Sequence, residues 1–216
     1  MKIDRSSRGL LAALYAGSIA VSALFIIFVP VPWLNAIVCT AFLWFMVWQT
    51  YFFRIPVRNT IEKGICSVCD GRVVIVEKTM ETEFLKRECL QVSVYMNFFD
   101  THANFWPYDG CVKHFSYIPG KHLLAFNPKA SLDNEHTCTL MVTPDSRELF
   151  FKQIAGGFAR RISNYAIVGE QVRKGDQCGI IKFGSRIDLF LPLDAKVEVK
   201  VGDFVKACET RIASFD

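Results

Sequence analysis

The sequence predicts a mainly β protein of the α+β class. We expect an N-terminal transmembrane helical hairpin, then a compact β-sandwich or barrel-like domain with about one long helix. Three observations lead to this expectation. About 45 residues, from Gly9 to Phe53, contain no Asp, Glu, Lys, Arg or His. Short β-branched or alternating runs follow that stretch. Near the C-terminus, a Val-x-x-Gly-Asp pattern typical of tight turns between strands begins at Val172 and again at Val199.

The apolar stretch is long enough for two membrane-crossing helices, at about 20 residues each. Pro30 and Pro32 interrupt it near its middle, which suits a turn between two helices. Four aromatic residues lie near the expected helix ends, where interfacial side chains gather: Trp33, Trp44, Trp48 and Tyr51. We therefore expect residues 1–58 to form a membrane anchor and residues 59–216 to form a separate domain.

The distribution of charge predicts which side of the membrane the domain occupies. Basic residues flank the apolar stretch at both ends, at Lys2, Arg5, Arg8, Arg54 and Arg58, and the Pro-rich turn carries none. The positive-inside rule then places both ends, and the domain, on the cytoplasmic side of the cell (inner) membrane. The stretch is too long for a cleaved signal peptide. A net charge of +4 without a basic stripe argues against nucleic acid as a partner.

Eight cysteines invite a disulfide or zinc interpretation. Cys66 and Cys69 have the Cys-x-x-Cys spacing, but no second such pair and no closely spaced histidine pair completes a set of four ligands. Cytoplasmic cysteines are normally reduced and behave as small apolar residues. We therefore expect no metal site and no disulfide framework.

After the anchor, the sequence is mainly typical of strands. Three runs are rich in β-branched or alternating residues: Val73–Val76, Leu90–Met96 and Cys138–Val142. One helix is expected in the middle of the domain. Ser146 to Leu149 could open it, and one buried face is indicated by Leu149, Phe150, Ile154 and Phe158.

A Gly-Ser peptide bond, Gly184-Ser185, lies between two apolar runs near the C-terminus. Glycine leaves its carbonyl group sterically open, and the serine hydroxyl can attack that carbonyl if a base removes its proton. Two residues upstream could provide this activation. Asp70 could orient His102, which in turn could deprotonate Ser185. Taken one at a time, a turn aspartate, a structural histidine and a turn serine are the better interpretations.

Together, these residues and several longer motifs match a known pattern. The chain resembles the phosphatidylserine decarboxylase family in its short, membrane-anchored form. The resemblance covers nearly the whole chain and is carried by these segments: Phe52–Arg58, Asp70-Gly71, Phe99–Asn104, Phe126–Ser131, Asn134-Glu135, Gln153–Gly156, Ala159–Ile162 and Gly179–Arg186.

The resemblance implies a self-processing enzyme. The chain would break between Gly184 and Ser185 into a β chain and an α chain, and Ser185 would lose ammonia and become a covalent pyruvoyl cofactor. His102, assisted by Asp70, would activate the hydroxyl for the first acyl shift. The pyruvoyl group would then act as an electron sink in the decarboxylation of phosphatidylserine to phosphatidylethanolamine. Basic side chains could hold the substrate phosphate, with Arg160, Arg161 and Arg186 as candidates.

The Val-x-x-Gly-Asp repeat also supplies an alternative. Such turns occur in biotinyl and lipoyl carrier modules, which attach their cofactor to a lysine at an exposed hairpin tip. Lys196 is the nearest candidate, in a poor setting. Within the decarboxylase resemblance, His136 stands where the family usually has arginine, and Cys208 stands where glycine is usual. The preferred lipid chains and a homo-oligomeric state stay open.

Overall fold

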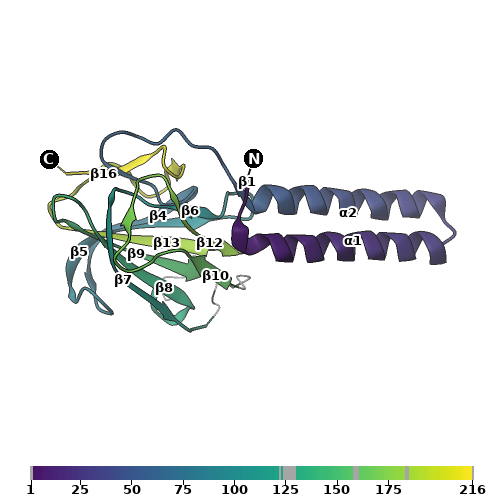
Figure 1. Cartoon of the computed structure of the whole chain (residues 1–216), viewed down its shortest axis with the longest axis horizontal. Helices are drawn as coiled ribbons and strands as arrows, with labels where there is room; N and C mark the ends of the chain where they lie inside the picture. Colours follow the sequence, from purple (N-terminus) through teal and green to yellow (C-terminus); the bar gives the residue numbers. More distant parts are fainter. Residues whose placement is uncertain (1, 122, 124–129, 158–160, 183–184, 216) are drawn as a thin grey trace. The chain divides into compact units, whose positions relative to one another are not determined.

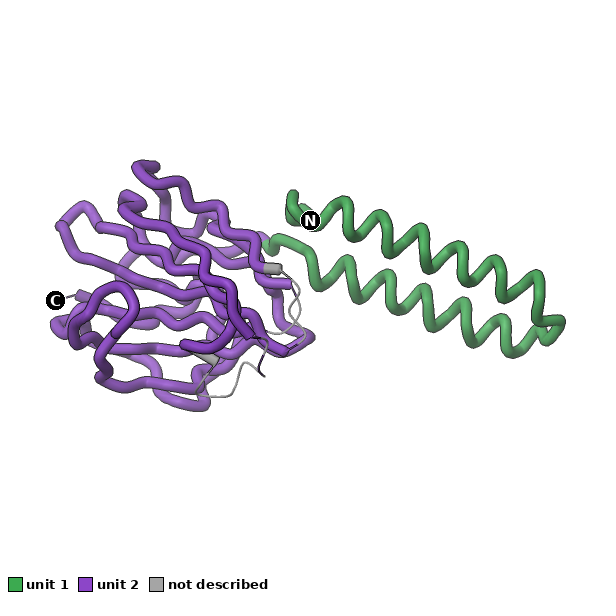
Figure 2. Tube along the Cα trace, turned by 90° about the horizontal axis from the view of Figure 1, so that it is seen from below, with its two compact units in different colours: residues 1–56 green, residues 57–216 purple. Residues whose placement is uncertain are grey.

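The computed structural model describes residues 2–121, 123, 130–157, 161–182 and 185–215. The chain divides into two compact units, Met1–Pro56 and Val57–Asp216, coloured separately in Figure 2.

The first unit is the predicted helical hairpin. Helices α1 (Arg8–Phe28) and α2 (Pro32–Phe52) are long and apolar enough to cross a membrane. The 3₁₀ helix η1 (Arg5–Ser7) precedes them, and short strands β1 (Lys2–Ile3) and β2 (Arg54–Ile55) pair with each other. Inside the hairpin, the Tyr15 hydroxyl bonds the Met46 carbonyl and the Thr50 hydroxyl. Pro32 begins α2 at the position where its missing N–H costs nothing.

The second unit is built from β-sheets (Figure 1). Its largest sheet has eight strands, and all neighbouring pairs run antiparallel. In spatial order they are β11 (Gln171–Val172), β7 (Gly110–Ile118), β8 (His136–Val142), β9 (Glu148–Ala155), β13 (Ser185–Leu191), β5 (Arg87–Met96), β4 (Gly71–Glu81) and β15 (Phe204–Val205). The predicted strands at 73–76, 90–96 and 138–142 are thus confirmed.

Two three-stranded sheets complete the unit. One contains β10 (Arg161–Asn164), β12 (Gln177–Lys182) and β6 (Ala103–Phe105), and the other contains β14 (Lys196–Val197), β16 (Arg211–Ser214) and β3 (Ile65–Cys66). The larger of two described hydrophobic clusters joins all three sheets, through residues such as Val94, Phe151 and Ile187 of the large sheet, Ile181 of β12 and Ile212 of β16. The predicted mainly β fold is therefore confirmed.

The prediction of a helix that begins near Ser146 is wrong, because strand β9 occupies Glu148–Ala155. The described part of this unit contains one short helix, α3 (Ala130–Asp133). Strand β9 lies between β8 and β13, and from Leu149 to Ala155 every residue is buried. A strand covered on both faces carries apolar residues at neighbouring positions, so its pattern also satisfies a helical repeat. Ser146 makes a turn, in which its N–H donates to the Thr143 carbonyl.

The repeated Val-x-x-Gly-Asp segments form two equivalent turns. The Asp176 N–H donates to the Arg173 carbonyl and the Asp203 N–H to the Lys200 carbonyl, each at 3.1 Å. The glycine before each aspartate has a positive φ, 88° at Gly175 and 99° at Gly202, which explains the residue type.

Candidate functional site

Ser185 is the first residue of β13, in the middle of the large sheet (Figure 1). It pairs with Met96, the last residue of β5, on one side and with Ala155, the last residue of β9, on the other. Its side chain is fully buried, and its Oγ lies 3.8 Å from the Met96 Sδ. Gly184, the other half of the predicted cleavage site, lies outside the described residues. Ser185 is therefore held in a water-poor position by strands on both sides.

His102 immediately precedes β6, and its carbonyl accepts a hydrogen bond from the Ile181 N–H of β12 at 3.3 Å. The imidazole is fully buried, with Nδ1 at 2.9 Å from the Asp100 carbonyl oxygen. Burial lowers the pKa of His102 to about 4, against the opposing effect of that carbonyl. The ring is therefore neutral at physiological pH. Because a carbonyl can only accept, Nδ1 carries the proton and Nε2 carries the lone pair that a base needs.

Asp70 lies just before β4, at a tight approach of two strands. The next residue, Gly71, has a φ of 152°, and a Cβ there would overlap the Tyr95 carbonyl oxygen. The carboxylate accepts a hydrogen bond from Arg58 through Oδ2 and one from the Ala207 N–H through Oδ1 at 2.8 Å. These described contacts hold the Asp70 carboxylate next to the start of β4.

The sheet register gathers the predicted residues at one end of the domain. Arg72 of β4 pairs with Tyr95 of β5, and Tyr95 pairs with Arg186 of β13. Asp70 and Ser185 therefore lie at the same end of the sheet, two strand spacings apart, or about 10 Å. The segment that leaves β5 after Met96 leads to His102. On that segment, burial and, to a smaller extent, the charge of Asp70 raise the pKa of Asp100.

The sequence motifs contained two further site residues to which no role was assigned. Asn104 of β6 and Gln153 of β9 are fully buried, and the Gln153 Nε2 donates to the Asn104 Oδ1 at 2.7 Å. The Asn104 Nδ2 lies 3.8 Å from the same Met96 sulfur that contacts Ser185. Only the presence of amide side chains inside two of the family motifs could have pointed to them, and that signal is weak without a structure.

Of the three candidate phosphate-binding arginines, the structure describes the side chain of Arg186 only. Arg186 is 1% exposed, and its guanidinium forms a two-pronged ion pair with Asp188, at 2.6 and 2.8 Å. The Arg186 charge is therefore neutralised by Asp188 in the buried part of the sheet. Arg160 lies outside the described residues, and the structure describes the backbone but not the side chain of Arg161.

The opposite face of the sheet carries a cluster of buried charges. The Lys152 ammonium contacts Glu83 and lies 2.9 Å from the Glu81 carboxylate, and the His136 Nε2 lies 3.2 Å from Glu83. The ligand-type atoms of Glu83, His136 and Cys138 lie within 4.8 Å of one another. Because Lys152 already neutralises the Glu83 carboxylate, we interpret the group as an ion-pair cluster. His136, whose pKa is raised by its hydrogen bonds, supplies a cation there.

The eight cysteines all have free thiols in the structure. A hydrogen bond with Cys208, together with burial, raises the pKa of Cys66. Burial and the carboxylates of Asp70 and Asp100 raise the pKa of Cys69 well above its ordinary value. These environments favour the protonated thiol at both positions of the Cys-x-x-Cys pair.

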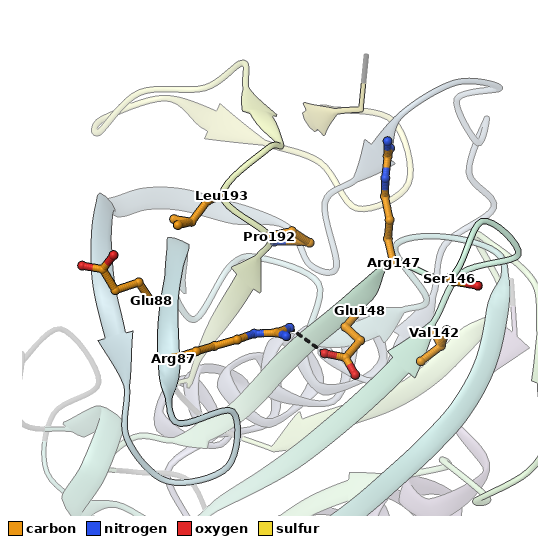
Figure 3. A pocket seen from close by; sticks show the side chains of 8 residues that line it. All are labelled: Arg87, Glu88, Val142, Ser146, Arg147, Glu148, Pro192 and Leu193. Carbon is orange, nitrogen blue, oxygen red and sulfur yellow. Dashed lines mark hydrogen bonds and ion pairs between the residues drawn. The ribbon is translucent and has the colours of Figure 1, made fainter.

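An open pocket of about 570 Å³ lies at the other end of β13, where Pro192 and Leu193 follow the strand (Figure 3). Arg87 and Glu148 form an ion pair of 2.6 Å within it. The seven-residue strand β13 runs from Ser185 to the edge of this pocket, a distance of about 20 Å. It is therefore separate from the candidate site.

Lys196, the residue on which the carrier alternative depends, pairs with Ser214 at the start of β14. Its position in a strand gives no support to attachment of a cofactor at a hairpin tip.

Comparisons with known proteins agree with the resemblance found in the sequence. A family model described as phosphatidylserine decarboxylase matches residues 45–213. Proteins named phosphatidylserine decarboxylase proenzyme are similar to this chain. The one from Amoebophilus asiaticus is 44% identical over 169 residues, covering 77% of this chain and 75% of that protein. The one from Porphyromonas gingivalis is 36% identical over 220 residues, covering 99% and 98%. The one from Syntrophus aciditrophicus is 40% identical over 192 residues, covering 88% of each.

Proposed function

Because the chain belongs to the phosphatidylserine decarboxylase family, a family of carboxy-lyases, we propose that it converts phosphatidylserine to phosphatidylethanolamine and carbon dioxide. It does so after cleaving itself between Gly184 and Ser185. The observation that carries the proposal is the position of Ser185. This hydroxyl is fully buried at the start of a central strand, at the end of the sheet where Asp70 also lies, and a neutral histidine lies on the segment that leaves the neighbouring strand.

In the self-cleavage, His102 serves as the base. Its Nε2 accepts the Ser185 hydroxyl proton while the Asp100 carbonyl holds Nδ1–H. The Ser185 Oγ then attacks the Gly184 carbonyl carbon, the C–N bond breaks, and an ester replaces the amide. Asp70, just before β4, assists His102 in this step. Elimination then breaks the Cβ–Oγ bond of residue 185, so that Gly184 leaves as a carboxylate and residue 185 becomes a dehydroalanine. Its enamine rearranges to an imine, and water displaces the nitrogen as ammonia, which leaves a ketone at the new N-terminus of the α chain.

The residues around Ser185 fit a cofactor made from the chain itself. The pyruvoyl group at position 185 supplies an electron sink for the carbon that loses carbon dioxide. The chain excludes water there, because Ser185, Met96 and Asn104 are all fully buried. A low-polarity site also favours departure of a charged carboxylate as neutral carbon dioxide.

The substrate and the anchor suit each other. Two apolar helices in the same chain would keep the enzyme at the lipid bilayer that holds phosphatidylserine. The basic residues on both flanks of the helical hairpin favour an inner-membrane protein with its β unit in the cytoplasm. The α and β chains stay together, because β13 of the α chain pairs with β5 and β9 of the β chain.

The proposal can be tested with phosphatidylserine labelled in the serine carboxyl carbon. Full-length protein in mixed detergent micelles should release labelled carbon dioxide and form phosphatidylethanolamine. Ser185→Ala should release none, since it lacks both the nucleophile and the cofactor precursor. Ser116→Ala, which removes a hydroxyl from β7, is the matched control and should retain activity. Cleaved wild-type protein that leaves the label in the lipid would contradict the proposed substrate.

A further inference from the structure

Three amide side chains form a row that ends at the Met96 sulfur, which the Ser185 hydroxyl also contacts. This amide row consists of Asn164 of β10, Gln153 of β9 and Asn104 of β6. Gln153 and Asn104 are fully buried. Hydrogen bonds to neighbouring protein groups, and not to water, therefore decide which way each amide oxygen and nitrogen points. The direction of the whole row can be worked out from its hydrogen bonds.

The direction is fixed at the far end by a backbone group. The Ala166 N–H, which can only donate, lies 2.7 Å from the Asn164 Oδ1. The Asn164 Nδ2 must therefore be the donor at the other side of that amide, and it lies 2.7 Å from the Gln153 Oε1. The Thr137 hydroxyl donates to the same oxygen at 2.9 Å. Two donors thus hold the carbonyl end of Gln153 toward β8 and β10.

The opposite end of Gln153 is then a donor as well. Its Nε2 lies 2.7 Å from the Asn104 Oδ1, so the Asn104 amide is turned with its oxygen toward Gln153. This leaves the Asn104 Nδ2 on the side of Met96 and Ser185. Both the Asn104 Nδ2 and the Ser185 Oγ lie 3.8 Å from the Met96 Sδ. Gln153 has little freedom to move, because its amide packs closely against Gly179. A Cβ atom added to that glycine would lie only 2.8 Å from the Gln153 Nε2.

We propose that Asn104 donates a side-chain N–H to the Ser185 Oγ during self-cleavage, and that Gln153 is the positioning residue that makes Asn104 present a donor there. As His102 removes the hydroxyl proton, negative charge develops on Oγ. An N–H aimed at that oxygen stabilises the charge, whereas the amide oxygen of a reversed Asn104 would repel it. The inference rests on the proposed function and adds a polarity requirement to it: Asn104 must present its N–H, and not its oxygen, to Ser185.

Gln153→Glu is the sharpest test, because it keeps the shape of the side chain and reverses its hydrogen bonding. When the introduced carboxyl group is ionised it can only accept, so Asn104 must turn over and present its oxygen to Ser185. When that carboxyl group is protonated it can donate to the Asn104 Oδ1, as the wild-type amide does. Self-cleavage of this variant should therefore be slow when the carboxyl group is ionised and recover when it is protonated.

The measurement uses full-length chain synthesised without cells in detergent micelles, then transferred to buffers between pH 5 and pH 9. The reaction is followed by the appearance of the α chain. We expect cleavage of Gln153→Glu to be at least about tenfold slower at the alkaline end than at the acid end, following a single titration, because a hydrogen bond to a charged oxygen is worth at least that factor. His102 remains mostly neutral over this range, since its pKa is about 4.

Three further variants separate polarity from packing. Asn104→Asp, which accepts from Gln153 but presents no N–H to Ser185, should be slow above the pKa of the new carboxyl group. Gln153→Leu should be slow at every pH. Gln91→Glu, which changes a buried amide of β5 that donates to the Ser93 hydroxyl, is the matched control and should follow wild type.

If Gln153→Glu cleaves at the wild-type rate from pH 5 to pH 9, the polarity requirement is wrong. If it is slow with no acid recovery while its unfolding temperature falls, Gln153 acts only in packing, and the inference again fails. Cleavage of wild type in the same assay keeps these failures distinct from a failure of the proposed function, in which wild type itself would not cleave.

Discussion

His102 combines complete burial with a defined tautomer. The Asp100 carbonyl holds Nδ1–H, and burial keeps the ring neutral with a pKa of about 4. A histidine in this state is a ready base at neutral pH, without a preceding deprotonation step. Its protonation below pH 4 removes the lone pair and with it the ability to activate Ser185.

Two results should follow in the self-cleavage assay. Cleavage of His102→Ala should slow by about a hundredfold or more, within the 10²–10⁴ range for general acid–base catalysis. In the wild type, the rate of self-cleavage, where it is slow enough to measure, should be constant from pH 5 to pH 8. The rate should decline as the pH falls through about 4, because the base becomes protonated. Cleavage of His102→Ala at the normal rate would show that another group is the base.

The proposed site residues differ in how far the sequence pointed to them and to their contacts. Ser185, His102 and Asp70 could be selected from the sequence because each has reactive chemistry and lies in a segment of the family pattern. The acceptor for Nδ1 of His102, the Asp100 carbonyl, is a backbone group and leaves no mark in the residue types. Arg58 as partner of Asp70 also required the fold, because twelve positions of chain separate the two residues.

Among the elements, β9 shows where sequence patterns fail. Its apolar residues lie on both faces of a central strand, so neighbouring positions are buried and no alternation appears. Strands β4, β5 and β8 were easier to predict, since β-branched residues and flanking turns identified them. Gln153 lies within the same misassigned segment, which is why its role beside Asn104 could not be found before the strand was placed.

The turn between β4 and β5 is tied to β8 and β9 by the buried charge cluster. The Glu81 carboxylate accepts the N–H groups of Phe84 and Leu85 and also contacts Lys152. Burial would raise the pKa of Glu83, but hydrogen bonds from His136 and Lys152 lower it to about 2. Burial would lower the pKa of His136, but its bonds to Cys138, Glu83 and the Asn134 carbonyl raise it to about 10.

These shifts predict a maximum in folding stability near pH 6.5. The contribution of His136 to the free energy of unfolding is complete below its ordinary pKa near 6.5. It is lost as the pH rises through about 10. On the acid side, His102 lowers stability as the pH falls from 6.5 to about 4, and the contribution of Glu83 is lost as the pH falls from about 4.5 through 2. Urea unfolding in micelles, followed by circular dichroism, should reveal both limbs.

His136→Gln provides the control for the alkaline limb. The wild type should lose roughly 2 kcal/mol of unfolding free energy between pH 6.5 and pH 10, since each pKa unit corresponds to about 1.4 kcal/mol before discounting for coupling within the cluster. The variant should be less stable at pH 6.5 and nearly flat above it. A wild-type curve that is level up to pH 10 would mean that His136 is not held as a cation.

For the molecule as a whole, composition was enough to predict two apolar helices followed by a β unit. The absence of Asp, Glu, Lys, Arg and His over about 45 positions is a strong and simple signal, and both expected helices form. The order of strands in the large sheet was beyond reach, because β13 pairs with β5 and β9, about 90 and 30 residues away in the chain. That pairing creates the site, since it aligns Ser185 with Met96 and Ala155.

The intact mass of purified full-length protein tests the formation of the cofactor from Ser185 most directly. Self-cleavage predicts two chains, with an α chain of 32 residues, Ser185 to Asp216, whose mass corresponds to an N-terminal pyruvoyl group in place of serine. That chain should react with a carbonyl reagent and resist stepwise N-terminal sequencing. A single chain with the mass of the full sequence, in protein shown to be folded, would contradict the account.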